Sequence, residues 1–280
     1  MNLLTSPSTD ESAVFGAQLR GWRLARGQSQ LALALAAGVS TRHLSYLETG
    51  RAGPSREMVL SLSLAMALPL RSRNQLLMAA GFAPMYRETA MDAPAMGPVR
   101  DALQFMLRAN EPNPTFVVDR RYDVTDANAS GRWLLSAFVA DSTHWTRPWN
   151  MAQLILRPEG MQAFLRNGDE VQRKVLGRLK RDLGGAQPRD SRDEALLREI
   201  SPALARLGQA PLPNPPLPGE PLPLLVGLQL QRGELALNFF TTIATLGTTL
   251  DVTLQEMRIE TLFPADAPTR AFLTARAAET

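Results

Sequence analysis

The sequence lacks cysteine altogether and holds only two histidines among its 280 residues. Without cysteine there is no disulfide framework, and the usual Cys/His spacing of a transition-metal site cannot be assembled. A magnesium site made only of carboxylates stays open, but we expect no metal and no cofactor. The hydrophobic content of 45% allows a sizeable core, in one large domain or, as we expect, two ordinary ones.

Long apolar runs and an export signal are also missing. Residues 1–12 lack the charged and apolar regions of a signal peptide. The most apolar stretch, Leu60 to Leu70, is interrupted by two serines and by Pro69. We therefore expect a cytoplasmic protein that does not enter a membrane.

The short motifs of common enzymes are absent as well. The chain has no GxSxG elbow, no P-loop, no GxGxxG and no HExxH. Asp119, Asp123 and Asp126 gather in one predicted hairpin, but turn formation explains them better than acid–base catalysis. We expect no catalytic residue and no enzyme.

Charge is nearly balanced over the whole chain but unevenly distributed along it. Residues 1–108 hold 11 Arg and 7 Asp or Glu, a balance of +4, whereas the remaining 19 basic and 20 acidic residues give −1. Lysine is scarce, since Lys174 and Lys180 are the only two. Arginine suits phosphate contacts. GC-rich coding explains the same bias equally well, so the bias alone indicates no partner.

The first 82 residues have the pattern of five short helices. Apolar residues recur at helical spacing from Val14 to Arg26, and Gly27 ends that helix. Four serines precede the later helical runs, where a hydroxyl can cap free backbone N–H groups. They are Ser29, Ser40, Ser55 and Ser72. We therefore predict an all-α domain over residues 10–82 and a proline-containing linker over residues 83–98.

After the linker the pattern changes to that of an α+β domain over residues 99–266. A helix at its start is followed by two-residue alternation over 115–119 and 122–127, typical of a hairpin. Four helical patterns follow, and three strand-like runs then end the domain. The helical patterns cover residues 129–138, 158–165, 169–183 and 192–207, and the strand-like runs cover residues 224–231, 234–242 and 249–263. This order predicts an antiparallel sheet.

Two details of the second domain need separate explanations. Residues 208–223 include seven prolines, so they can form neither a helix nor an interior strand. We expect a stiff surface loop, with a PxxP ligand for an aromatic groove as the alternative. In the last strand-like run the apolar residues change phase near Gln255–Glu256. A β-bulge would produce that change.

The most informative stretch runs from Ser29 to Gly50. Leu33, Ala34, Val39, Leu44 and Leu47 can pack two helices at a steep angle, and Gly38 permits the tight turn between them. The second of these helices then presents its N-terminal end, where polar side chains can reach base edges in the major groove. A generic helical bundle could show similar apolar spacing, but it would not need the caps, the glycine turn and the polar face together.

This stretch resembles the phage Cro/repressor (XRE) type of helix-turn-helix, with its Ser-Gln start, Ala-Gly-Val-Ser turn and Leu-Glu-x-Gly ending. The resemblance covers residues 15–81 and implies a lambda-repressor-like five-helix domain that binds double-stranded DNA. By this resemblance, base contacts fall to Thr41, Arg42 and Tyr46, and positions at the groove edge to His43 and Ser45. Gln30 would contact a phosphate and Arg51 the DNA backbone. Ser40 would be one of these DNA-binding residues.

Within that resemblance, individual residues have different expected roles. Arg42 is the best candidate for bidentate guanine recognition. Glu48 is expected to be a buried structural partner and His43, taken alone, a surface histidine. Leu31 and Leu35 depart from the family, which usually has acidic or polar residues there. They indicate packing against the second domain or against a partner, or else ordinary drift.

The second domain resembles the MmyB-like regulators, which join this helix-turn-helix to a PAS-like ligand-binding domain. Residues 114–128 and 249–266 carry the resemblance, which spans about 98–266. It implies a sheet with helices over one face and, between them, a pocket for a small apolar, fatty-acid-like molecule. Weak candidates for its lining are Phe116, Trp133, Phe138 and Phe239, although a filled core would use the same residues.

The sequence therefore predicts a DNA-binding transcription regulator. We expect a homodimer on a near-palindromic operator, because two-fold symmetry of the protein requires it of the site. A ligand in the second domain would change operator binding. The alternative is a repressor whose second domain serves only dimerisation.

Overall fold

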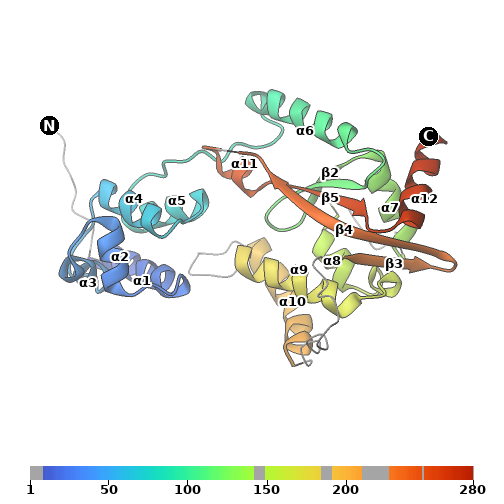
Figure 1. Cartoon of the computed structure of the whole chain (residues 1–280). Coiled ribbons are helices and arrows are strands. Elements are labelled where there is room, and N and C mark those ends of the chain that lie inside the picture. The colour runs from blue at the N-terminus through green and yellow to red at the C-terminus, as the bar shows by residue number, and fades with distance from the viewer. Residues whose placement is uncertain (1–8, 142–148, 184–190, 210–226, 248, 280) are drawn as a thin grey trace. The chain divides into compact units, whose positions relative to one another are not determined.

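A computed structural model describes residues 9–141, 149–183, 191–209, 227–247 and 249–279 (Figure 1). These residues form two compact units. The first unit runs to Thr89 and also takes in residues 249–255, and the second contains the rest. The predicted proline-rich loop at 208–223 falls almost entirely outside the described residues.

The first unit contains the five predicted helices. They are α1 (Thr9–Ala25), α2 (Gln30–Ala37), α3 (Thr41–Glu48), α4 (Arg56–Ala65) and α5 (Leu70–Ala79). One apolar core joins them, with Phe15, Leu19, Leu44 and Leu62 fully buried. The all-α helix-turn-helix architecture is thus confirmed.

Helix ends in this unit follow the sequence signals with two exceptions. Ser29, Ser40 and Ser55 cap α2, α3 and α4 as predicted. However, α1 begins at Thr9 rather than near Val14. The fifth helix begins at Leu70 and not at Ser72, because the Ser72 side chain is buried inside the helix instead of capping it.

The second unit is an α+β domain with one five-stranded antiparallel sheet, which confirms the predicted fold class. Its strands are β1 (Thr115–Val118), β2 (Val124–Ala127), β3 (Leu228–Arg232), β4 (Leu235–Thr245) and β5 (Arg258–Pro264), in the order β2-β1-β5-β4-β3. Strand β5, although last in sequence, lies between β1 and β4 and pairs with both.

Helices cover both faces of this sheet, not one face as expected (Figure 1). On one face α6 (Gly97–Ala109) packs Leu103 and Leu107 against Val117 and Ile259. The opposite face carries Phe116 and Leu262 and packs into the main core. The helices that contribute to that core are α7 (Ala129–Phe138), α8 (Met151–Leu156), α9 (Gly168–Leu183), α10 (Ser191–Gln209) and α12 (Ala267–Ala278).

Three parts of the chain after the predicted linker differ from the prediction. The run 249–263 is not one bulged strand, because Val252–Glu256 forms the short helix α11 before β5 begins. Of the helix expected at 158–165, only a 3-10 turn at Gln162–Phe164 forms. Helices α8 and α12 were not predicted, since α8 is only six residues long and α12 lies beyond the expected end of the domain.

Residues 249–255 of the connection between β4 and β5 are part of the first unit. The Asp251 carboxylate accepts hydrogen bonds from the Thr89 backbone N–H at 3.2 Å and hydroxyl at 2.6 Å. The Gln255 side chain accepts one from the Leu70 backbone N–H at 2.6 Å. Because Pro69 offers no side-chain cap to α5, Gln255 satisfies a free N–H group at the start of that helix.

Candidate nucleic-acid interface and ligand cavity

The turn between α2 and α3 has the geometry that the sequence predicts. Gly38 has a φ of +69°, a left-handed conformation that glycine adopts without steric cost. Ser40 then accepts a hydrogen bond from the His43 backbone N–H at 3.1 Å and starts α3. Leu44 and Leu47 are buried on the inner side of α3, so its polar side chains face outward.

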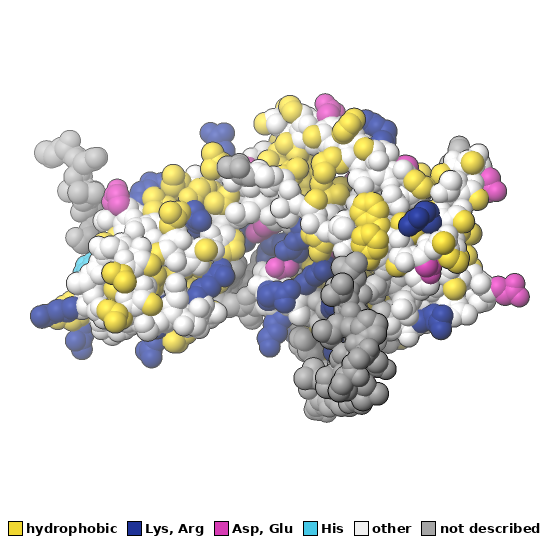
Figure 2. Space-filling view, in the orientation of Figure 1, with side chains coloured by type: hydrophobic (Ala, Val, Ile, Leu, Met, Phe, Trp, Pro, Cys, Tyr) yellow, Lys and Arg dark blue, Asp and Glu magenta, His cyan; other side chains and the backbone are white. Residues whose placement is uncertain are grey.

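The outer face of α3 carries the predicted DNA-binding side chains. Arg42 is exposed, and Thr41, His43, Ser45 and Tyr46 are half-buried. The Arg42 Nε donates a hydrogen bond to the Tyr46 hydroxyl at 3.0 Å, and its guanidinium lies 5.5 Å from the centre of the Tyr46 ring. Arg51 is exposed just beyond α3. In Figure 2, arginine side chains project from this part of the first unit.

A buried ion pair holds α1 against the C-terminal end of α3. Arg23 on α1 donates from Nε and Nη2 to the two Glu48 oxygens at 2.6 and 2.9 Å. Gln30 at the start of α2 donates a third bond to Glu48 at 2.8 Å. Burial by itself raises the pKa of Glu48, but the hydrogen bonds from Arg23 and Gln30 outweigh it, so the pKa lies below the ordinary value.

This Arg23–Glu48–Gln30 cluster agrees with the structural role expected of Glu48. It also shows that the Gln30 amide has a partner inside the protein. An amide offers two N–H donors, so one can remain for a phosphate oxygen. The phosphate contact of Gln30 stays a prediction.

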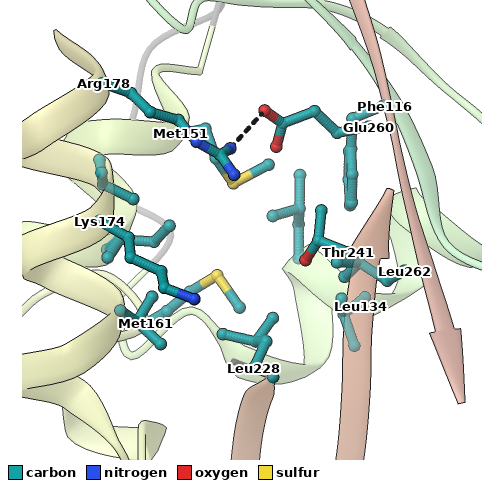
Figure 3. Close-up of a pocket in the computed structure, with 15 residues that line it drawn as sticks. Phe116, Leu134, Met151, Met161, Lys174, Arg178, Leu228, Thr241, Glu260 and Leu262 are labelled. Carbon is teal, nitrogen blue, oxygen red and sulfur yellow. Dashed lines mark hydrogen bonds and ion pairs between the residues drawn. The ribbon is translucent and has the colours of Figure 1, made fainter. Parts of the chain in front are cut away.

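The second unit contains a cavity of about 260 Å³ between the sheet and helices α7, α8 and α9 (Figure 3). Most of its wall is apolar, and ten of the lining side chains are hydrophobic. They are Phe116, Leu134, Leu135, Met151, Ile155, Met161, Val171, Val175, Leu228 and Leu262. A mostly apolar wall with a few polar groups is typical of a small-molecule site.

The polar groups of the cavity come from two sides. Lys174 and Arg178 point into it from α9, while Thr241 on β4 and Glu260 on β5 face them from the sheet (Figure 3). Arg178 Nη1 lies 3.4 Å from Glu260 Oε1. Burial raises the pKa of Glu260 above its ordinary value, although Arg178 and Arg258 oppose the shift. Burial also lowers the pKa of Lys174.

A family model described as the MmyB-like transcription regulator ligand binding domain matches residues 99–275, which is more than half of the chain. The chain belongs to the MmyB-like transcription regulators. A helix-turn-helix domain model also matches residues 14–76. The protein is therefore a DNA-binding transcription regulator with a ligand-binding domain.

Three solved structures resemble parts of this MmyB-like regulator. The restriction-modification controller protein C.AhdI from Aeromonas hydrophila is 30% identical over 22% of this chain and 96% of its own, with a TM-score of 0.22. The clp gene regulator ClgR from Corynebacterium glutamicum is 32% identical over 27% of this chain and 91% of its own, with a TM-score of 0.23. A second ClgR structure is 27% identical over 38% of this chain and 94% of its own, also with a TM-score of 0.23. These TM-scores are too low to support a structural comparison. No curated protein matches the chain.

Of the four weak candidates for the ligand pocket of this regulator, the structure places Phe116 in the cavity wall. Phe138 and Phe239 are fully buried in the core, and neither lines the cavity. Trp133 does not line the cavity either: its ring centre lies 5.4 Å from that of Phe272 and 4.4 Å from the Arg276 guanidinium carbon.

The charged residues of the cavity were missed at the sequence level. Their signal was nevertheless present in α9. Val171, Lys174, Val175 and Arg178 follow the i, i+3, i+4, i+7 spacing of one helix face, so two cations share the apolar stripe. Glu260 gave no such signal, because β5 also holds Arg258 and Thr261, and only the strand register places Glu260 between Phe116 and Ile243.

No helix among the described residues is both long and apolar enough to cross a membrane.

Proposed function

We propose that this regulator is a cytoplasmic homodimer that reads a near-palindromic operator with α3 of each subunit. The observation that carries the proposal is the outward polar face of α3, where Arg42 is exposed, above the buried Leu44 and Leu47. In a helix-turn-helix, such a face enters the major groove, and the two-fold symmetry of a dimer is matched by the DNA site.

Within this proposal, Arg42 reads guanine and Arg51 grips the phosphate backbone. Arg42 is exposed, and its partner Tyr46 is a neutral hydroxyl one helical turn away. A guanidinium can therefore keep donors for the O6 and N7 atoms of a guanine while its stem is oriented by that bond. Thr41, Tyr46, His43 and Ser45 would lie along the same groove, and Gln30 and Ser40 at its phosphate edge.

The test uses DNA selected by the protein from a random pool, compared with unrelated DNA in the same buffer. Arg42→Ala should cost about 1–3 kcal/mol on the selected DNA and much less on unrelated DNA. Arg51→Ala should weaken binding to both and lower the salt dependence. Arg270→Ala, which removes an exposed arginine from α12, is the matched control and should change neither.

Equal losses on selected and unrelated DNA for Arg42→Ala would remove Arg42 from base recognition. Binding to both DNAs that Arg42→Ala and Arg51→Ala leave unchanged would remove α3 and the residue after it from the DNA interface.

We further propose that a small apolar, fatty-acid-like ligand in the cavity of the second unit modulates operator binding. The apolar wall with cations from α9 supports this class of ligand, because it offers contacts to a hydrocarbon chain and to an acid group. Native mass spectrometry of the purified protein should detect an adduct that is lost on denaturation. A ligand-free mass, together with operator binding that fatty acids leave unchanged, would favour a domain that serves only dimerisation.

A further inference from the structure

Glu260 is an unusual side chain to find in the wall of an apolar cavity. It lies on β5, in the middle of the sheet, where its direct cross-strand neighbours are the apolar residues Phe116 on β1 and Ile243 on β4. Its side chain is 11% exposed. A carboxylate in such a place loses most of its hydration, which must be compensated by cations or by a proton.

The cations near Glu260 compensate its lost hydration only in part. Its contact with Arg178 is 3.4 Å, well beyond the roughly 2.7–2.9 Å of a close charged hydrogen bond. Arg258, two residues earlier on the same strand, forms its own ion pair with Asp182 at 2.7 Å. The Tyr122 side chain, from the turn between β1 and β2, contributes no charge that stabilises the carboxylate. Burial consequently raises the pKa of Glu260 despite both arginines.

The Lys174 ammonium is the other cation of the cavity. It lies one helical turn before Arg178, and no hydrogen bond or ion pair holds it among the described residues. Glu170, one turn earlier on α9, is the nearby anion. An acid group that enters the cavity would therefore settle by Lys174 and Arg178, and it would become a second carboxylate beside Glu260.

We propose that Glu260 takes up a proton when an anionic ligand head binds beside Lys174 and Arg178, so that ligand binding depends on pH. This inference rests on the proposed function, since it concerns the ligand of the same cavity. Keeping two carboxylates ionised beside the same two cations costs free energy. Protonation of Glu260, the buried carboxylate, removes that cost. The proton comes from the solvent and leaves again when the ligand does.

The experiment is isothermal titration calorimetry of the full chain with decanoate at pH 7.5, in phosphate and in Tris. These buffers differ in ionisation enthalpy, so the difference between the two binding enthalpies counts the protons exchanged. We expect an uptake between zero and one proton in the wild type. Across a pH series the decanoate Kd should then rise with pH, with a limit of about tenfold per pH unit.

Three variants assign the proton. Glu260→Gln should bind decanoate without proton uptake and with a flat pH profile. Glu234→Gln, which removes an exposed carboxylate from the turn between β3 and β4, should behave as the wild type. In Lys174→Arg the side chain at position 174 cannot lose its charge in this pH range. This variant should therefore still take up a proton, at Glu260.

The possible failures are distinct. Decanoate binding with no proton uptake, or uptake that persists in Glu260→Gln and vanishes in Lys174→Arg, would overturn the role of Glu260 and leave the ligand class intact. No heat of binding and no effect of decanoate on operator affinity would overturn the ligand class and the inference with it.

Discussion

Both units of this regulator bury a glutamate among arginines, and the two carboxylates are paired very differently. Glu48 accepts three hydrogen bonds of 2.6 to 2.9 Å from Arg23 and Gln30. Glu260 has Arg178 at 3.4 Å. The pKa of Glu48 lies below its ordinary value and that of Glu260 above it. The first carboxylate holds helices together, whereas the second is poised to exchange a proton.

The largest effect should follow from breaking the pair in the DNA-binding unit. Glu48→Ala leaves Arg23 buried without its counter-ion, which costs about 3–5 kcal/mol of unfolding free energy. A urea titration, read by hydrogen exchange of peptides from α1 and α3, measures this loss.

The matched control replaces both partners, Arg23→Met with Glu48→Leu. Replacing a whole buried ion pair by apolar residues is often neutral, so the double variant should recover most of the loss. A loss of less than about 1 kcal/mol in Glu48→Ala would show that the Arg23–Glu48 ion pair does not hold α1 against α3.

A smaller effect is expected at the cap of the recognition helix. Ser40→Ala removes the hydrogen bond to the His43 N–H and should cost about 1 kcal/mol of stability. Ser55→Ala removes the equivalent bond at the start of α4, at 3.2 Å, with a similar cost. Urea titration compares the two stabilities, and fluorescence anisotropy compares their affinities for the selected DNA. Only Ser40→Ala should weaken that affinity, and equal weakening by both would contradict a special role for the start of α3.

The smallest effect should come from Glu260, and it should have the opposite sign. Because its folded-state pKa is raised, its contribution to stability is present below the unfolded-state pKa and is lost as pH rises through the folded value. Glu260→Gln should therefore raise stability at pH 7.5 relative to the wild type, and the gain should shrink towards pH 5. Urea titrations at both pH values, with hydrogen exchange measured in peptides from β5 and α9, test the sign of this stability change. A loss at pH 7.5 would show that the arginines stabilise Glu260 as fully as Arg23 stabilises Glu48.

The two units also differ in how far their sequences predict them. In the first unit the informative residues are close in sequence: Ser29 and Ser40 cap their own helices, and Gly38 makes the turn between them. Local hydrogen bonds and short spacings decide these features, so the helix-turn-helix and its outer face could be predicted. The start of α5 could not, because its cap, Gln255, comes from 185 residues further along the chain.

The cavity is built from residues far apart in sequence, which explains why only Phe116 of the four candidates lines it. Bulky aromatic side chains fill a core as readily as they line a pocket, and Phe138 and Phe239 do the former. The two strand-like halves of 249–263 were joined in the prediction because α11 is too short for a helical period to show. Charged residues within an apolar helix stripe, as Lys174 and Arg178 are on α9, were the better signal.

The most direct test of ligand-controlled DNA binding is the fluorescence anisotropy of labelled, selected DNA titrated with the full chain, with and without decanoate. We expect decanoate to change the DNA affinity of the wild type and to change that of Lys174→Met much less, because that variant lacks a cation for the acid group. The same decanoate-dependent change in both proteins, or no change in either, would contradict control of α3 by the cavity of the second unit.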